Sequence, residues 1–220
     1  SLDLQNAKTT DDGINEVSKL ENLNKLVLHK TQVTDAGMKR VAKLENLTYL
    51  NLGGTKITGS GLKELQGLEK LAELYLHETT VTDAGLEEIS KLNNLTKLWL
   101  PGNNQVTDLG MKEVAKLKNL KEIYLPPKIT DVGLNELTKL EKVTRLRLQD
   151  TQVTDLGMKE VAELENLTYL DLSDTQITDV GLKELAVLKK LTGLSLFGTR
   201  ITKAGVDELQ KALPKCRIFQ

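Results

Sequence analysis

The chain has 220 residues, with 30 Lys and Arg against 31 Asp and Glu and a formal net charge of -1. This balance argues against the basic surface that phosphate-driven nucleic-acid binding needs, and no stretch approaches the roughly 18 consecutive apolar residues that would predict membrane insertion. Leucine supplies 43 residues and the aromatic types only seven, which predicts a leucine core, while the single cysteine, Cys216, excludes a disulfide framework.

A period of about 24 residues runs through the whole sequence. Each unit begins with an alternating Leu-x-Leu or Ile-x-Leu, which predicts a short strand with one buried face. A turn with the pattern Thr-Asp-x-Gly follows in seven of nine units, and then apolar residues recur about every three positions, as in an amphipathic helix. In chain order the nine units start at Leu2, Leu26, Leu50, Leu74, Leu98, Ile123, Leu146, Leu170 and Leu194.

The Thr-Asp-x-Gly turn predicts where each helix begins. We expect its Thr, with the Asp beside it, to cap the unpaired N–H groups of the first helical turn. We expect the glycine to let the helix approach its own strand. Helix capping then accounts for all of these Asp residues, so they do not predict carboxylate pairs for acid–base catalysis.

One strand–loop–helix unit cannot cover its own leucines, so neighbouring units must stack around a continuous core. Strands are about 4.8 Å apart and helices about 8–10 Å apart, so the stack must curve. The sequence therefore predicts an α/β fold: a right-handed solenoid with a concave parallel β-sheet and convex α-helices. We expect a single domain over residues 1–220, with nine repeats and a rudimentary tenth strand near Ile218.

These residues carry a family resemblance. The pattern Leu-x-x-Leu-x-Leu-x-x-Thr-x-Ile-Thr-Asp-x-Gly-Leu-x-x-Leu resembles leucine-rich repeat proteins over essentially the whole chain, in particular the helical subclass of F-box-associated and bacterial repeats. The segment from Ala212 to Ile218 is similar to the endings of bacterial, planctomycete-like members. The resemblance implies a non-enzymatic module that recognises a protein or peptide.

The aromatic residues are concentrated in the columns beside the strand leucines, which should face the concave surface. Tyr75, Trp99 and Tyr124 occupy one column on consecutive strands, so we expect a contiguous ladder of exposed rings, with Trp99 partly exposed. Aromatic residues beside Arg are typical of binding hot spots. The predicted partner-binding residues are Tyr75, His77, Trp99, Pro101, Tyr124, Pro126, Arg145 and Arg147, with Tyr49, Tyr169 and Phe197 as secondary concave residues.

Two features surround this cluster. Repeat five has 25 residues and repeat six has 23, and the prolines that follow their strands predict stiff loops shaped differently from the others. The only histidines, His29 and His77, share a column two strands apart, so their backbones should lie roughly 10 Å from each other. We expect two exposed surface histidines rather than metal ligands.

No motif pairs a nucleophile with a base and no phosphate-binding loop is present, so we expect no catalytic residue, no metal and no cofactor. The favoured hypothesis is protein or peptide recognition on the concave face, centred on repeats four to six. Two alternatives stay open: carbohydrate binding on the ring platform, and the substrate-recognition part of a larger ligase or kinase. Leu2 and Leu4 form an apolar strand edge, so we also expect the residues to belong to a longer chain and to self-associate end to end.

Overall fold

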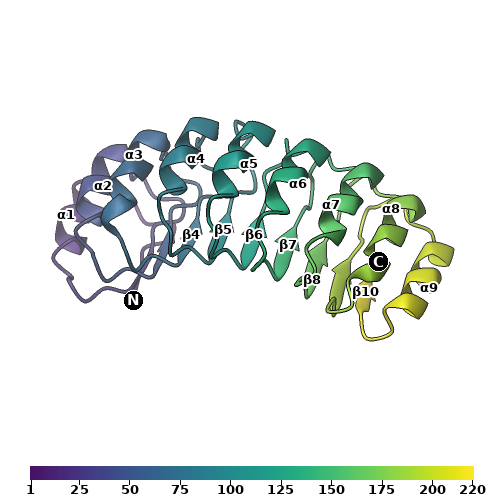
Figure 1. Cartoon of the computed structure of the whole chain (residues 1–220). Helices are drawn as coiled ribbons and strands as arrows, with labels where there is room; N and C mark the ends of the chain where they lie inside the picture. Colours follow the sequence, from purple (N-terminus) through teal and green to yellow (C-terminus); the bar gives the residue numbers. More distant parts are fainter.

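The structure is a computed structural model that describes all 220 residues. It contains one open sheet of ten parallel strands in sequential order, and the chain ends lie at opposite ends of the arch (Figure 1). The strands are β1 (Leu2–Asp3), β2 (Lys25–Val27), β3 (Tyr49–Asn51), β4 (Glu73–Tyr75), β5 (Lys97–Trp99), β6 (Glu122–Tyr124), β7 (Arg145–Arg147), β8 (Tyr169–Asp171), β9 (Gly193–Ser195) and β10 (Arg217–Phe219). The prediction of a parallel α/β solenoid is confirmed.

The strand register places equivalent residues of successive repeats side by side. Leu26 pairs with Leu50, Leu50 with Leu74, and Ile218 with Leu194. Every second strand residue therefore enters the same core, where leucines dominate a continuous cluster of 57 buried residues. The intervening residues form columns on the opposite, concave face.

Short helices cover the other side of the sheet and form the convex surface in Figure 1. They are α1 (Gly13–Val17), α2 (Asp35–Val41), α3 (Gly59–Lys63), α4 (Asp83–Ile89), α5 (Asp108–Val114), α6 (Asp131–Leu137), α7 (Met158–Ala162), α8 (Asp179–Glu184) and α9 (Lys203–Ala212), together with the 3-10 helices η1 (Glu64–Gly67), η2 (Asp155–Gly157) and η3 (Leu185–Val187). None of them combines the length and hydropathy that crossing a bilayer requires.

The loops after the strands share one sharp turn, called the corner below, which is marked by a residue with positive φ. In eight repeats the second residue past the strand's last leucine has a positive φ, as Lys30, Glu78 and Gly102 do. Repeat five keeps this corner at Gly102, so its extra residue lies further along the loop. Repeat six lacks it, because Pro127 occupies the position and proline fixes φ near -65°. The predicted difference in loop shape thus holds at this corner for repeat six.

The Asp of the Thr-Asp-x-Gly turn does not cap its own helix, so that part of the sequence interpretation is wrong. Its carboxylate reaches the next repeat, where it accepts hydrogen bonds from the backbone N–H and the hydroxyl of the capping Thr. Asp131, for example, accepts from Thr154 N at 2.8 Å and from Thr154 Oγ1 at 2.7 Å. The seven such Asp–Thr clamps are Asp11–Thr34, Asp35–Thr58, Asp83–Thr107, Asp108–Thr130, Asp131–Thr154, Asp155–Thr178 and Asp179–Thr202.

The helix glycines make room for these carboxylates rather than for their own strands. A Cβ on Gly37 would lie 2.6 Å from Asp11 Oδ1, and a Cβ on Gly110 would lie 2.5 Å from Asp83 Oδ1. Such contacts are far inside van der Waals distance. Wherever the preceding repeat has this Asp, its carboxylate and the helix glycine therefore pack against each other as one unit.

Repeat three lacks this unit because Gly59 stands where the other repeats have Asp. Thr82, the residue such an Asp would hold, makes no side-chain cap. A Cβ built on Gly59 would lie 2.8 Å from Gly85 Cα, so α3 and α4 approach through backbone contact instead.

Candidate functional site

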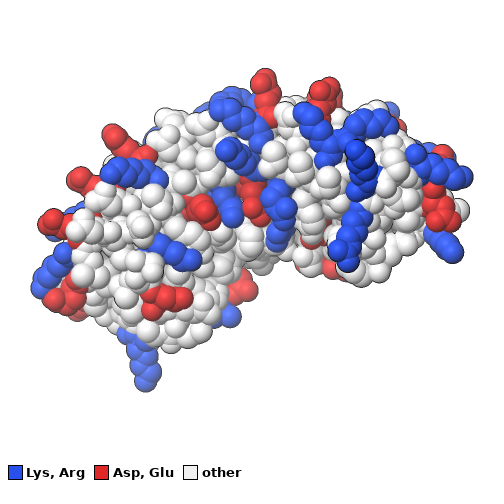
Figure 2. Space-filling view, turned by 90° about the horizontal axis from the view of Figure 1, so that it is seen from below, with Lys and Arg blue, Asp and Glu red and all other residues white.

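The concave face carries three columns of side chains set by the strand register. The column between the strand leucines contains Tyr75, Trp99, Tyr124 and Arg147 in adjacent positions. Figure 2 shows the molecule from this side, with acidic and basic side chains next to each other around the middle of the face.

The aromatic rings form a contiguous ladder, as predicted. Ring centroids are 4.9 Å apart for Tyr49 and Tyr75, 4.8 Å for Tyr75 and Trp99, and 5.8 Å for Trp99 and Tyr124. The last two pairs meet edge to face, an arrangement that the ring quadrupole favours. The ladder thus spans strands β3 to β6 and includes one residue, Tyr49, that had been assigned only a secondary place.

The rings are less exposed to solvent than the sequence suggested. Tyr75 is only 8% exposed, so the prediction that it is an exposed ring is wrong, whereas Trp99 and Tyr124 are partly exposed as expected. Tyr75 lies between two rings and its hydroxyl donates to Glu73 Oε2 at 3.0 Å. Burial is the main reason that its pKa is raised far above the usual tyrosine value. Tyr75 therefore packs as a support for its neighbouring rings.

Arg147 is the centre of the cationic part of the site. Its guanidinium carbon lies 5.1 Å from the Trp99 ring centroid, 5.9 Å from that of Tyr124 and 5.6 Å from that of Tyr169. Its Nη2 is also 3.6 Å from Glu122 Oε1. Cation–π contacts of this kind hold the guanidinium in place without consuming all its hydrogen-bond donors.

A row of charges flanks the ladder in the neighbouring column. Lys97 Nζ lies 3.4 Å from Glu73 and 3.3 Å from Glu122, and Arg145 Nε lies 3.6 Å from Glu122. The Arg145 guanidinium also lies over the Tyr169 ring, 4.5 Å from its centroid. Tyr169 therefore belongs to the cluster, although the sequence placed it at the margin.

Two buried donors in the cluster have no partner. Trp99 Nε1 and Arg147 Nε are inaccessible to solvent and make no hydrogen bond. A buried donor without an acceptor lowers folding stability by about 1–3 kcal/mol, so such groups are rare in native protein cores. Both atoms occur in residues of the same ring-and-guanidinium cluster.

The proline positions differ in accessibility. Pro101 borders a hollow of ≈ 220 Å³ together with His77, Glu78, Trp99 and Gly102. Pro126 is buried, so its predicted role as a direct contact residue is not supported by its position. Phe197 is 52% exposed and makes none of the ring contacts of the ladder.

The histidines were expected to be separate and exposed, and this expectation is wrong. Both are half-buried, and His77 Nε2 lies 3.0 Å from His29 Nδ1. The rings lean toward each other across Gly53, which follows β3, the strand between them. Burial, and secondarily the charge of His29, lower the pKa of His77.

The remaining candidate chemistry is sparse. No group of three or more His, Cys, Asp or Glu residues converges on a possible metal position. Cys216 is buried, and burial raises the pKa of its thiol to about 11, which disfavours the reactive thiolate.

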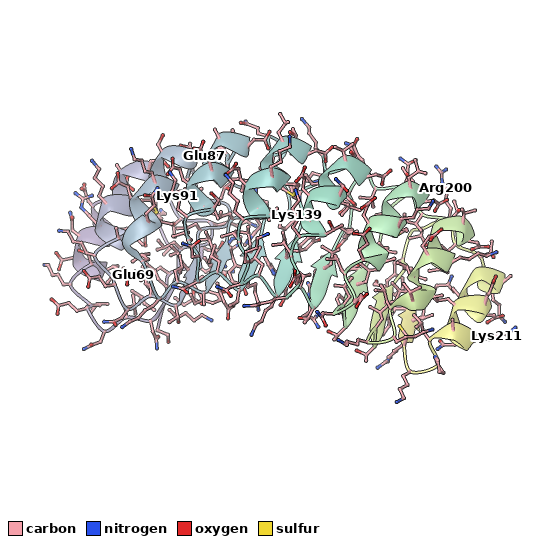
Figure 3. The ribbon with its side chains drawn as sticks, viewed as in Figure 1. Glu69, Glu87, Lys91, Lys139, Arg200 and Lys211 are labelled. Atoms are coloured by element: carbon pink, nitrogen blue, oxygen red, sulfur yellow. The ribbon has the colours of Figure 1, made fainter.

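The helical side offers other features that sequence reasoning missed or did not use. Glu69 and Lys91, labelled in Figure 3, border a polar hollow of ≈ 300 Å³ between the ends of repeats three and four. The residue before the helix glycine is apolar in four consecutive repeats and exposed by 68–73%: Leu109, Val132, Leu156 and Val180. The signal in the sequence was a large apolar residue in place of the Ala, Ser or Asp found at this position in the other repeats.

The family model described as leucine rich repeat matches residues 21–81 and 141–201. The chain belongs to the leucine-rich repeat family. Among curated proteins, none matches the sequence of this leucine-rich repeat chain.

Solved structures share the architecture. A leucine-rich repeat protein of Leptospira interrogans is 27% identical with a TM-score of 0.72, over 100% of this chain and 60% of that protein. An internalin C2 of Listeria monocytogenes is 27% identical with a TM-score of 0.67, over 96% of this chain and 84% of the internalin. The plant peptide hormone receptor RGFR1, solved in complex with RGF2, is 18% identical with a TM-score of 0.57, over 91% of this chain and 32% of the receptor, and shows the fold alone. The family and the two bacterial neighbours indicate a protein-interaction module, a class that is generally non-enzymatic.

Proposed function

We propose that the chain recognises a protein or peptide on its concave face, centred on strands β4 to β6 with the arginines of β7 at the edge of the site. The observation that carries the proposal is the cluster of Trp99, Tyr124 and Arg147 with its two unpaired buried donors. Aromatic residues and Arg dominate binding hot spots because they bury a large area and lose little conformational freedom.

The unpaired donors suggest what the partner brings. Trp99 Nε1 and Arg147 Nε can only donate, so the partner must supply acceptors such as backbone carbonyls or carboxylates. Because both atoms are covered in the free chain, such contacts require the two side chains to rotate on binding. A peptide with acceptors spaced along its backbone fits this requirement.

The ring geometry favours this proposal over carbohydrate binding. A sugar stacks on an open ring face, but Trp99 meets Tyr75 and Tyr124 at interplanar angles of 60° and 76° and has a guanidinium over its ring. The ladder therefore offers ring edges and a cation rather than a flat platform.

A site-specific photo-crosslinking experiment tests the location. The crosslinking amino acid is placed either at Arg145, on the concave face, or at Leu156, on the exposed apolar stripe of the helical side. We expect the same partner to be crosslinked repeatedly from position 145 and not from position 156. Crosslinking from position 156 alone would place the interface on the other side of the solenoid and refute the proposal.

Affinity measurements with the purified partner test the residues. We expect Arg147→Ala and Trp99→Phe to weaken binding, with a loss of about 2 kcal/mol, or roughly thirtyfold, for the arginine. Trp99→Phe keeps a ring in the ladder but removes the indole donor. Gln5→Ala, an exposed residue in a concave column far from the ladder, is the matched control and should leave the affinity unchanged.

A further inference from the structure

Both histidines of the chain meet at one point of the concave face. His29 follows β2 and His77 follows β4, two strands apart, yet their rings are only 4.8 Å apart between centroids. The nitrogens facing each other are His29 Nδ1 and His77 Nε2, at 3.0 Å. Strand spacing alone would keep the two backbones about 10 Å apart, so both side chains lean inward.

Gly53, just after the intervening strand β3, makes this approach possible. A Cβ at this position would overlap the His77 ring, so any other residue would push the ring away. Gly53 is the only glycine in its concave column, whose other members include Gln5, Pro101 and Phe197. The space above Gly53 is thus shaped for two imidazoles.

Two imidazole nitrogens share a single proton at this point. His29 Nδ1 is 3.0 Å from His77 Nε2 and 2.9 Å from the carbonyl oxygen of Gly53, which also accepts from the backbone N–H of Lys30 at 2.8 Å. With both rings neutral, one N–H on either ring lies between the two facing nitrogens. In both tautomers the Nδ1 of His77 is buried without any partner.

We propose that His29 and His77 form a two-histidine site for a divalent transition-metal ion, with Cu²⁺ the tightest of the series. A cation in the gap satisfies both facing nitrogens in place of the single shared proton. Imidazole nitrogen is a suitable ligand for Cu, Ni and Zn, and affinity across these ions peaks at Cu²⁺.

The spacing of the nitrogens suits a shared metal ion. With metal–nitrogen bonds of about 2.0–2.1 Å, two ligands at a right angle lie roughly 2.9 Å apart, whereas tetrahedral ligands lie about 3.3 Å apart. The nitrogens, which are hydrogen-bonded at 3.0 Å in the metal-free chain, lie within this range, and the choice of Cu²⁺ rests on the order of affinities. Since the protein supplies only two side-chain nitrogens, the other positions are open to water or to an incoming group.

Charges of both signs lie next to the gap. Lys30 and Glu78 directly follow the two histidines in the sequence. Glu78 also borders the hollow that His77, Trp99 and Pro101 line. The site therefore lies beside the aromatic ladder and next to the only tryptophan of the chain.

Titration of the whole chain with Cu²⁺ alone tests the proposal, in a Cys216→Ser background so that the thiol does not bind or reduce the metal. Trp99 fluorescence should be quenched by one equivalent of Cu²⁺, and the electron paramagnetic resonance spectrum should show imidazole nitrogen coupling. His29→Ala and His77→Ala should each weaken binding by more than about tenfold, the scale on which losing support around a metal already acts.

Two matched variants and two other metals complete the experiment. Gly53→Ala keeps both histidines but displaces a ring, so it should also weaken binding, whereas Gln5→Ala should not. Separate titrations with Ni²⁺ and Zn²⁺ should give weaker binding than Cu²⁺. Wild-type spectra without imidazole coupling, or unchanged Cu²⁺ affinity in both histidine variants, would overturn the proposal, and neither result depends on where the protein partner binds.

Discussion

Removal of one Asp–Thr clamp in the middle of the solenoid should cost a predictable amount of stability. The Asp131 carboxylate accepts two hydrogen bonds from Thr154, at 2.8 and 2.7 Å, in a half-buried position. Hydrogen bonds to a charged group contribute about 1.5–3 kcal/mol each when shielded from water, and partial exposure reduces that value. We expect Asp131→Ala to lower the free energy of unfolding by about 2 kcal/mol.

Thermal and urea denaturation measure this loss. For a chain of this size, about 2 kcal/mol corresponds to a decrease in Tm of roughly 4–8 °C. Because stability in a repeat array is approximately a sum of nearest-neighbour interfaces, the lost contact should also make the unfolding transition less cooperative between α6 and α7. Asp131→Asn, which keeps one oxygen acceptor, should lie between wild type and Asp131→Ala.

Asp12→Ala is the control, because Asp12 is exposed and its side chain makes no hydrogen bond. The reasoning is refuted if Asp131→Ala and Asp12→Ala change stability equally. In a double-mutant cycle with Thr154→Val, the coupling energy should report the hydroxyl contact alone, since valine keeps the backbone N–H.

Three further predictions concern the same scaffold. Gly110→Ala should destabilise the fold by about 1–3 kcal/mol through overlap with the Asp83 carboxylate, whereas Gly67→Ala, with open space around it, should be neutral or stabilising in the same urea titrations. Hydrogen bonds from the Thr202 hydroxyl, and secondarily from its backbone N–H, hold the pKa of Asp179 below its ordinary value. The stability that the ionised carboxylate adds is therefore complete above about pH 4 and is lost as the pH falls through the lowered pKa. A carboxyl NMR titration should show the lowered pKa of Asp179, and this pKa should rise in Thr202→Val. Since the pKa of Cys216 is raised to about 11, alkylation at pH 8 should be roughly 100-fold slower in the native chain than in urea, and equal rates would contradict the burial argument.

The repeat and the ladder could be predicted from sequence because both depend on register. A fixed 24-residue period places each strand residue beside its equivalent in the next repeat, so residues at equivalent sequence positions become neighbours across the sheet. Tyr75, Trp99 and Tyr124 therefore came together as expected. The same logic does not give burial, which depends on how far each ring tilts: Tyr75 became a buried support because its neighbours cover it on both sides.

The contacts that sequence reasoning missed depend on the reach of a side chain between repeats. Asp beside Thr is equally consistent with a cap within the repeat and with a clamp to the next one. The sequence does hold a signal, because Gly59 replaces Asp in repeat three, but only the structure shows that Thr82 in repeat four loses the contact. The histidine pair carried a similar signal in the glycine between the two histidines of one column.

The two faces of the solenoid have different structural roles, which explains how the proposed binding site can be held ready without a partner. The leucine core and the Asp–Thr clamps fix the spacing of the strands, so the concave columns do not have to stabilise the fold by themselves. The rings of Trp99 and Tyr124 are nevertheless restrained, by each other and by the guanidinium of Arg147. Since side chains that are already ordered lose less entropy on association, the ladder should favour binding by preorganisation rather than by a large open apolar area. On this view the unpaired donors of Trp99 and Arg147 are the part of the site left for the partner to satisfy, and they cost stability only while the site is empty.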